Sequence, residues 1–159
     1  MVVDDIRRNK PRTMGELNFD GSLLGNLGHA GAGGIFWDSF GRVLATYKVF
    51  LGVTGVFEAE VEGLMEGLMR AKEMNFNQLW VESDSSAVVT SLHQRKIPWF
   101  ALQRWSTIIS HSYREGNSIA DYLARDAVNS GVSADNMTLP SHIQDMLARD
   151  AEGRPRYRF

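Results

Sequence analysis

Cysteine is absent from this chain, which excludes disulfide bonds and thiolate zinc sites. Long apolar runs are absent as well: no stretch approaches the roughly 20 residues that a membrane-spanning helix needs. Residues 1–8 lack the apolar segment of a signal peptide. We therefore expect an intracellular protein, nuclear or cytoplasmic, with no signal peptide and no membrane partner.

The chain also has no excess of basic residues. Its 17 Lys and Arg against 19 Asp and Glu leave a formal net charge of −2, which does not by itself indicate a nucleic-acid binder. Net charge is a poor guide, however, where acidic residues gather in a site that cations fill. Two basic stretches, residues 7–12 and 154–158, lie in terminal segments and are interpreted as solvated tails.

Hydrophobic periodicity divides the chain into strands and helices. Alternating or continuous apolar residues predict strands, and apolar residues at a spacing of three to four predict helices. The expected strands cover residues 17–20, 35–37, 42–48, 78–83 and 107–109, the last leading to His111. The expected helices cover residues 56–74, 87–94 and 117–128.

This order of elements predicts an α/β fold with a five-stranded mixed sheet. Three strands joined by short turns form an antiparallel meander, and the later strand–helix–strand steps imply parallel, right-handed crossovers. We expect one domain over residues 15–131. A flexible leader, 1–14, would precede it, and a tail, 132–159, with a short helical pattern at 143–148 would follow.

Glycine is concentrated between the first two strands, at positions 25, 28, 31, 33 and 34. The phosphate-binding patterns G-x-x-x-x-G-K-[ST] and G-x-G-x-x-G, the latter between a strand and a helix, are both absent. Close packing of adjacent strands is the interpretation that remains.

Four acidic residues occupy four different local settings. Asp20 ends the first strand, Glu60 lies near the start of the 56–74 helix, Asp84 follows the fourth strand, and Asp121 begins the last helix. In the expected topology the four converge at one edge of the sheet. Converging carboxylates repel one another unless cations neutralise them, so the set predicts a divalent-metal site. Two metal ions held by carboxylates are a common device for cutting phosphodiester bonds.

Each of these residues has a simpler interpretation when taken alone. A single acid is most often a solvated surface group. Asp84 and Asn117 are suited to cap helices, and His111 to end a strand with its hydrogen bonds satisfied. The joint placement of the four acids is what favours a site.

Five segments in this order resemble the ribonuclease H family of type 1, and specifically the ribonuclease H-like domain of plants and plant retroelements. They are LNFDGS at 17–22, GAGGIF with DSFGRVL at 31–44, EAEVEGL at 58–64, WVESDS at 80–85 and HSYREGNSIADYLA at 111–124. The resemblance runs from about Leu17 to Gly131. It implies the ribonuclease H-like fold, with sheet order 3-2-1-4-5 and helices on both faces.

The resemblance also implies a catalytic site. Asp20, Glu60, Asp84 and Asp121 match the family's metal-binding carboxylates and would hold two Mg²⁺ ions, with Mn²⁺ able to substitute. Asp20 is the expected bridging ligand, and Asp121 the ligand of the more weakly bound ion. His111 matches the mobile histidine that assists product release or leaving-group protonation. Four residues match positions beside the site or in contact with substrate: Gly21, Ser22, Ser85 and Asn117.

The implied activity is endonucleolytic hydrolysis of the RNA strand of an RNA–DNA hybrid, and we expect a monomer. The chain departs from the family over residues 98–113, where the crossover helix before the last strand is shortened. About ten residues of helix span only ~15 Å. This departure favours an alternative, a catalytically weak or inactive nucleic-acid-binding or interaction module derived from a retroelement, whereas the intact acids favour the enzyme.

A 3′-exonuclease relative is a third hypothesis, but it would need a second acid where this chain has Ser22. The sequence leaves open whether the chain is free-standing or part of a polyprotein.

Overall fold

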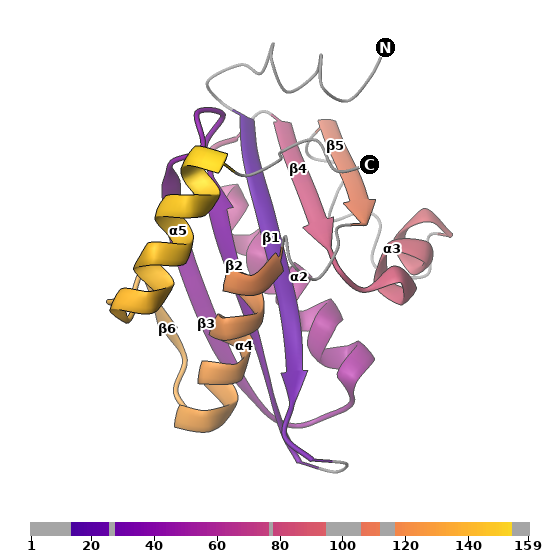
Figure 1. The fold of residues 1–159 in the computed structure, drawn as a ribbon. Helices are drawn as coiled ribbons and strands as arrows, with labels where there is room; N and C mark the ends of the chain where they lie inside the picture. Colours follow the sequence, from indigo (N-terminus) through magenta and orange to yellow (C-terminus); the bar gives the residue numbers. More distant parts are fainter. Residues whose placement is uncertain (1–13, 26–27, 77, 95–105, 112–116, 154–159) are drawn as a thin grey trace.

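The computed structural model describes residues 14–25, 28–76, 78–94, 106–111 and 117–153. Within them, one mixed sheet carries helices on both faces (Figure 1). Its strands are β1 (Met14–Leu23), β2 (His29–Trp37), β3 (Val43–Val53), β4 (Gln78–Ser83), β5 (Ser106–His111) and β6 (Ala134–Asp135). The helices are α2 (Val56–Glu73), α3 (Ser86–His93), α4 (Ser118–Ser130) and α5 (Ser141–Gly153). No helix of these ranges is long and apolar enough to span a membrane.

The strand order is β5-β4-β1-β2-β3-β6, so the predicted order of the first five strands and the α/β fold are confirmed. β1, β2 and β3 pair antiparallel, whereas β1 with β4 and β4 with β5 pair parallel. The two-residue β6 adds a sixth strand beside β3, which was not predicted. A strand of two residues is too short to produce an alternating pattern in the sequence.

The last parallel strand takes the position that the sequence predicts. β5 pairs with β4 in continuous register from Gln78↔Ser106 to Ser83↔His111. α3 ends at His93, and most of the shortened crossover, residues 95–105, lies outside the described residues.

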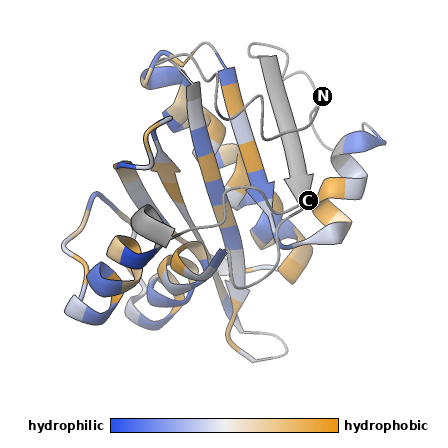
Figure 2. Cartoon of the chain, turned by 45° about the horizontal axis from the view of Figure 1, so that its top comes forward, coloured by the Kyte–Doolittle hydropathy of each residue, from blue (hydrophilic) through white to orange (hydrophobic). Residues whose placement is uncertain are grey.

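Each face of the sheet has its own apolar core. In Figure 1, α4 and α5 lie in front of the sheet and α2 behind it. Figure 2 shows hydrophobic and hydrophilic residues alternating along strands of the sheet. On β2 three consecutive apolar residues enter the two cores in turn, with Phe36 on one face and Ile35 and Trp37 on the other. The core under α2 includes Leu17, Phe19, Phe36, Leu64 and Leu68. The core under α4 includes Ile35, Trp37, Ile119, Leu123 and Ile143.

Glycines of β2 let α4 approach the sheet closely. A Cβ at Gly33 would lie 2.5 Å from the Leu123 Cβ and 2.6 Å from the Ala124 nitrogen. A Cβ at Gly31 would lie 2.6 Å from the Ala124 carbonyl oxygen. For Gly31 and Gly33 the interpretation as strand–strand packing is wrong, because the element that they admit is a helix. For Gly34 it is confirmed, since a Cβ there would overlap the ring of Tyr47 on the adjacent strand β3. A side chain at Gly31 or Gly33 would push α4 away from β2.

The segment after Gly131 returns to the sheet. The Thr46 N–H donates to Asn136 Oδ1 at 2.9 Å, and the Asn136 N–H donates to the Thr46 carbonyl at 2.9 Å. α5 then packs Ile143, which is 3% exposed, into the core under α4. The observed helix is longer than the expected 143–148, since apolar spacing marks only the residues that a helix buries.

We expect Gly33→Ala to lower the free energy of unfolding by about 1–3 kcal/mol, because the added methyl overlaps the backbone of α4. Urea unfolding measures the change. Gly55→Ala is the matched control: its φ of −82° suits any residue, and the added methyl would meet only the flexible Glu58 carboxylate. The control should change stability by less than about 1 kcal/mol. Equal effects of the two variants would contradict the close approach of α4.

Candidate metal centre

The pairing of β1 with β4 sets two acids side by side. The parallel register runs from Met14↔Gln78 to Asn18↔Glu82. Two residues further along each segment come Asp20 and Asp84, which therefore lie at the same level of the sheet. Because neighbouring strands are about 4.8 Å apart, the two side chains begin close together.

Glu60 reaches the same place from the first turns of α2. The helix approaches β1 at Gly21, where a Cβ would lie 2.6 Å from the Glu60 nitrogen. One turn later, a Cβ at Gly63 would lie 3.0 Å from the Asp20 carbonyl oxygen. Small residues at both contacts thus hold the start of α2 against the part of β1 that carries Asp20.

The three carboxylates form a compact cluster of oxygen donors. One oxygen each of Asp20, Glu60 and Asp84 lies within 4.8 Å of the others. Asp20 is 3% exposed and Glu60 is 7% exposed, whereas Asp84 is partly exposed. Ligand oxygens at about 2.1 Å from one Mg²⁺ are at most about 4.2 Å apart, so the cluster has nearly the dimensions of a shared cation site.

Burial and neighbouring charge raise the pKa of Asp20 to about 10. Burial is the largest cause; the charge of Glu60 and a hydrogen bond between the two carboxyl groups come next. Asp84 and Asp121 add smaller electrostatic contributions. Without a cation, the Asp20–Glu60 pair therefore keeps a proton at neutral pH. A divalent cation relieves the same repulsion and would displace that proton.

Asp121 lies at the margin of this cluster. It occupies the first turn of α4, and its carboxylate pairs with the Arg125 guanidinium, with 3.0 Å between Nε and Oδ2. Its charge still contributes to the raised pKa of Asp20. The structure therefore brings three of the four predicted acids together and leaves the fourth nearby, paired with an arginine.

Asn117 connects α4 to β1 beside Asp20. Its side chain is buried, and Nδ2 donates to the Phe19 carbonyl oxygen at 2.8 Å. The sequence suggested Asn117 as a helix cap. It does occupy the N-cap position of α4, but its side chain makes no capping hydrogen bond. The amide instead bonds the beginning of α4 to the residue that precedes Asp20.

The remaining predicted residues lie close to the acids along the chain or in the register of the sheet. His111 is the last residue of β5, and its backbone is in register with Ser83, which precedes Asp84. Ser85 caps α3, because its Oγ accepts a hydrogen bond from the Val88 N–H at 3.3 Å. Ser22 comes two residues after Asp20 and lines a cavity that also contacts α4.

Arg125 and Asn129 also line this cavity, and the sequence did not single them out. An exposed arginine or asparagine on a helix looks like an ordinary surface residue. The available signal was their spacing: Asp121, Arg125 and Asn129 are four residues apart and so share one face of α4.

A family model described as reverse transcriptase-like matches residues 18–127 of the chain. The chain belongs to this ribonuclease H family. The resemblance inferred from the sequence is thereby confirmed. A curated protein of Arabidopsis thaliana, provisionally named a ribonuclease H protein, is 30% identical over 156 residues. The match covers 90% of this chain but 25% of the relative, so the chain spans about a quarter of that protein's length.

Two solved ribonuclease H structures resemble this family member over nearly their whole length. The ribonuclease H1 of the archaeon Halobacterium salinarum has a TM-score of 0.69 and 25% identity, over 74% of this chain and 98% of the other. The N-terminal ribonuclease H domain of a Mycobacterium tuberculosis protein has a TM-score of 0.68 and 29% identity, over 74% and 94% of the two chains.

With a chelator present at about pH 7, we expect Asp20→Asn to raise the free energy of unfolding of this ribonuclease H-family chain. The reason is that the amide replaces a buried ionisable group. The sign follows from the pKa. The folded value of about 10 lies above the ordinary 3.8, so the folded state retains a proton that the unfolded state releases. Stability from this group is therefore lost as pH rises from about 4 towards about 10.

Urea midpoints at about pH 4 and about pH 7 measure this effect. The gain from Asp20→Asn should be larger at the higher pH, and Mn²⁺ should stabilise the unmodified chain more than the variant. Asp145→Asn, at an exposed position on α5, is the control and should show neither trend. A gain that is the same at both pH values would contradict the electrostatic explanation.

Proposed function

We propose that this chain is a divalent-metal-dependent endoribonuclease that hydrolyses the RNA strand of RNA–DNA hybrids. The observation that carries the proposal is the cluster of Asp20, Glu60 and Asp84, with oxygens within 4.8 Å of one another, in a member of the ribonuclease H family.

The donor set suits Mg²⁺ or Mn²⁺. All three groups offer hard carboxylate oxygens, which these ions prefer. Burial raises the pKa of Asp20 most, and the charge of Glu60, which a cation would offset, raises it further. Asp20 is the proposed bridging ligand, and Glu60 and Asp84 are proposed to complete the coordination on each side of it. Asp121 is proposed to hold the second, weaker ion. When bound, the two ions would supply an activated water and neutralise charge that develops on the phosphate.

His111 is proposed to move a proton during the reaction. Its backbone ends β5 beside Ser83, next to the acid cluster along β4. An imidazole is the side chain whose ordinary pKa lies nearest neutrality, so it can both accept and donate a proton there.

Four residues are proposed to position the hybrid. Gly21 is half-buried beside Asp20 and is proposed to offer its backbone to the hybrid. The hydroxyls of Ser22 and Ser85 suit contacts to 2′-hydroxyl groups. Asn117 is proposed to act through its hydrogen bond to Phe19, which holds α4 and β1 together at the site. Contacts of this kind would distinguish RNA from DNA by the ribose rather than by base sequence.

A second candidate function is hybrid binding without efficient cleavage, as in a module derived from a retroelement. The observation that favours it is the ion pair between Asp121 and Arg125. In this pair the carboxylate of the fourth acid is bound to a guanidinium instead of being free to bind a cation. The two candidates differ in one measurable property, the Mn²⁺-dependent loss of intact RNA strand.

We expect Glu60→Gln to reduce cleavage of the RNA strand by about 100-fold or more, the scale on which removal of one electrostatic group acts in a preorganised site. A gel assay with an end-labelled hybrid and Mg²⁺ or Mn²⁺ measures the rate. Glu62→Gln is the matched control, since Glu62 lies on the same helix and is exposed. It should retain the rate of the unmodified chain.

Asp20→Asn should abolish the same activity, and adding EDTA to the unmodified chain should do so too. Double-stranded DNA of the same sequence should remain uncut. A well-folded sample that binds the hybrid but leaves it intact at high Mn²⁺ would falsify the enzyme proposal and support the binding module.

A further inference from the structure

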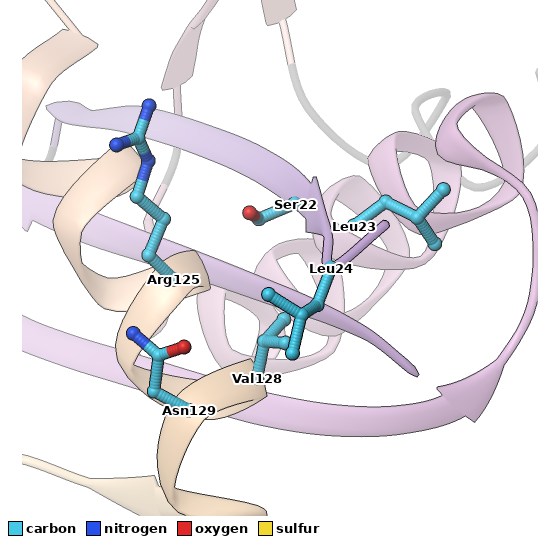
Figure 3. Close-up of a pocket in the computed structure, with 6 residues that line it drawn as sticks. All are labelled: Ser22, Leu23, Leu24, Arg125, Val128 and Asn129. Atoms are coloured by element: carbon cyan, nitrogen blue, oxygen red, sulfur yellow. The ribbon is translucent and has the colours of Figure 1, made fainter. Parts of the chain in front are cut away.

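A cavity of about 310 Å³ lies between the end of β1 and the second half of α4. Figure 3 shows that Ser22, Leu23 and Leu24 line it from one side and Arg125, Val128 and Asn129 from the other. Three of these side chains bring polar groups: a hydroxyl, a guanidinium and an amide. Leu24 and Val128 add an apolar surface between them. The volume is at the lower end of the range of about 300–1,000 Å³ for ligand pockets.

The cavity has one of the four acids near it on each of its two sides. On β1, Ser22 follows Asp20 by two residues. On α4, Arg125 follows Asp121 by one turn and pairs with its carboxylate at 3.0 Å. A polynucleotide with one phosphate at the cluster could therefore extend into the cavity with the next part of its backbone.

Arg125 is the cationic group of the cavity, and 60% of its side chain is exposed. A guanidinium can bind phosphate through two parallel hydrogen bonds. Asn129 lies one turn further towards the carboxyl end of α4, where the helix dipole disfavours anions. The phosphate is therefore expected at Arg125, and neutral sugar oxygens at Asn129 and Ser22.

We propose that this cavity is a nucleotide subsite that binds one backbone phosphate and its sugar beside the cleavage centre. The proposal rests on the proposed function, since it assumes that a polynucleotide lies across the acid cluster. Arg125 binds the phosphate, while Ser22 and Asn129 contact the sugar.

The test measures hybrid binding by fluorescence anisotropy over a series of salt concentrations. The full chain carries Asp20→Asn throughout, so that the hybrid stays intact in Mg²⁺. Arg125→Gln should weaken binding about tenfold at low salt. It should also reduce the slope of log K against log [salt] by about 0.9, the value for one lost phosphate contact. Arg125→Lys should keep the slope, because it keeps the charge.

Arg42→Gln is the matched control. Arg42 pairs with Asp38 four residues away at 2.7 Å, with its side chain 75% exposed. It lies by the β2–β3 turn, at the other end of the sheet from Ser22, because Trp37 pairs with Glu16 near the start of β1. Its removal should leave both affinity and slope unchanged.

A double-mutant cycle distinguishes two roles of Arg125: direct binding of a phosphate, and neutralisation of the Asp121 charge that would otherwise repel the phosphate. If Arg125 binds phosphate, Arg125→Gln should still weaken binding when Asp121→Asn is present. If Arg125 only neutralises Asp121, the effect should vanish in that background, and the subsite is overturned.

Cleavage by the unmodified chain decides which proposal has failed. If it cuts the hybrid while Arg125→Gln binds like Arg42→Gln, the subsite is wrong and the proposed function stands. If the unmodified chain neither binds nor cuts the hybrid, both proposals fall.

Discussion

The position of β1 between β2 and β4 is the constraint on which both the fold and the acid cluster depend. Two buried hydrogen bonds join side chains of the three strands: Asn18 Nδ2 donates to Glu82 Oε2 at 3.0 Å, and Trp37 Nε1 donates to Asn18 Oδ1 at 3.1 Å. A slip of one residue would send every side chain of β1 to the opposite face and break both bonds. It would also remove Asp20 from the level of Asp84. The same pairing thus fixes the two cores and the metal centre.

The acid cluster opposes folding, and the packing around it must offset this cost. Burial and the proximity of Glu60 raise the pKa of Asp20 to about 10, which means that an ionised Asp20 is strongly disfavoured there. Glycine at position 21 lets α2 pack so closely against β1 that a Cβ there would lie 2.6 Å from the Glu60 nitrogen. An arrangement that costs stability and persists only because its surroundings are rigid is typical of a site that performs chemistry. The rigidity comes from a sheet packed on both faces.

Periodicity and the order of elements were enough to predict the mixed sheet and the settings of Glu60, Asp84 and Asp121, because these features depend on local patterns of burial. The strand order and the helices on both faces followed from the family resemblance. The expectation that Asp20 ends the first strand was wrong, since β1 continues to Leu23. Contacts between distant segments were not predictable in the same way. The bond of Asn117 to Phe19 spans 98 residues, and it replaces the local cap that its residue type suggested. Likewise, Gly33 has no local signal that its neighbour is a helix. The cavity at Arg125 was not predictable from a local pattern, because it is formed only where α4 packs beside β1.

The four acids fall into two groups that are held by different parts of the molecule. Asp20, Glu60 and Asp84 come from β1, α2 and the end of β4, which share the sheet and the core under α2. Asp121 comes from α4, which is held by the glycines of β2, by the core on the other face and by Asn117. A small displacement of α4 would therefore change the distance of Asp121 from the cluster without disturbing the other three. Because Arg125 moves with the same helix, the fourth acid and the proposed phosphate contact would shift together. The position of α4 on the sheet is thus the structural variable that would decide between efficient cleavage and binding alone.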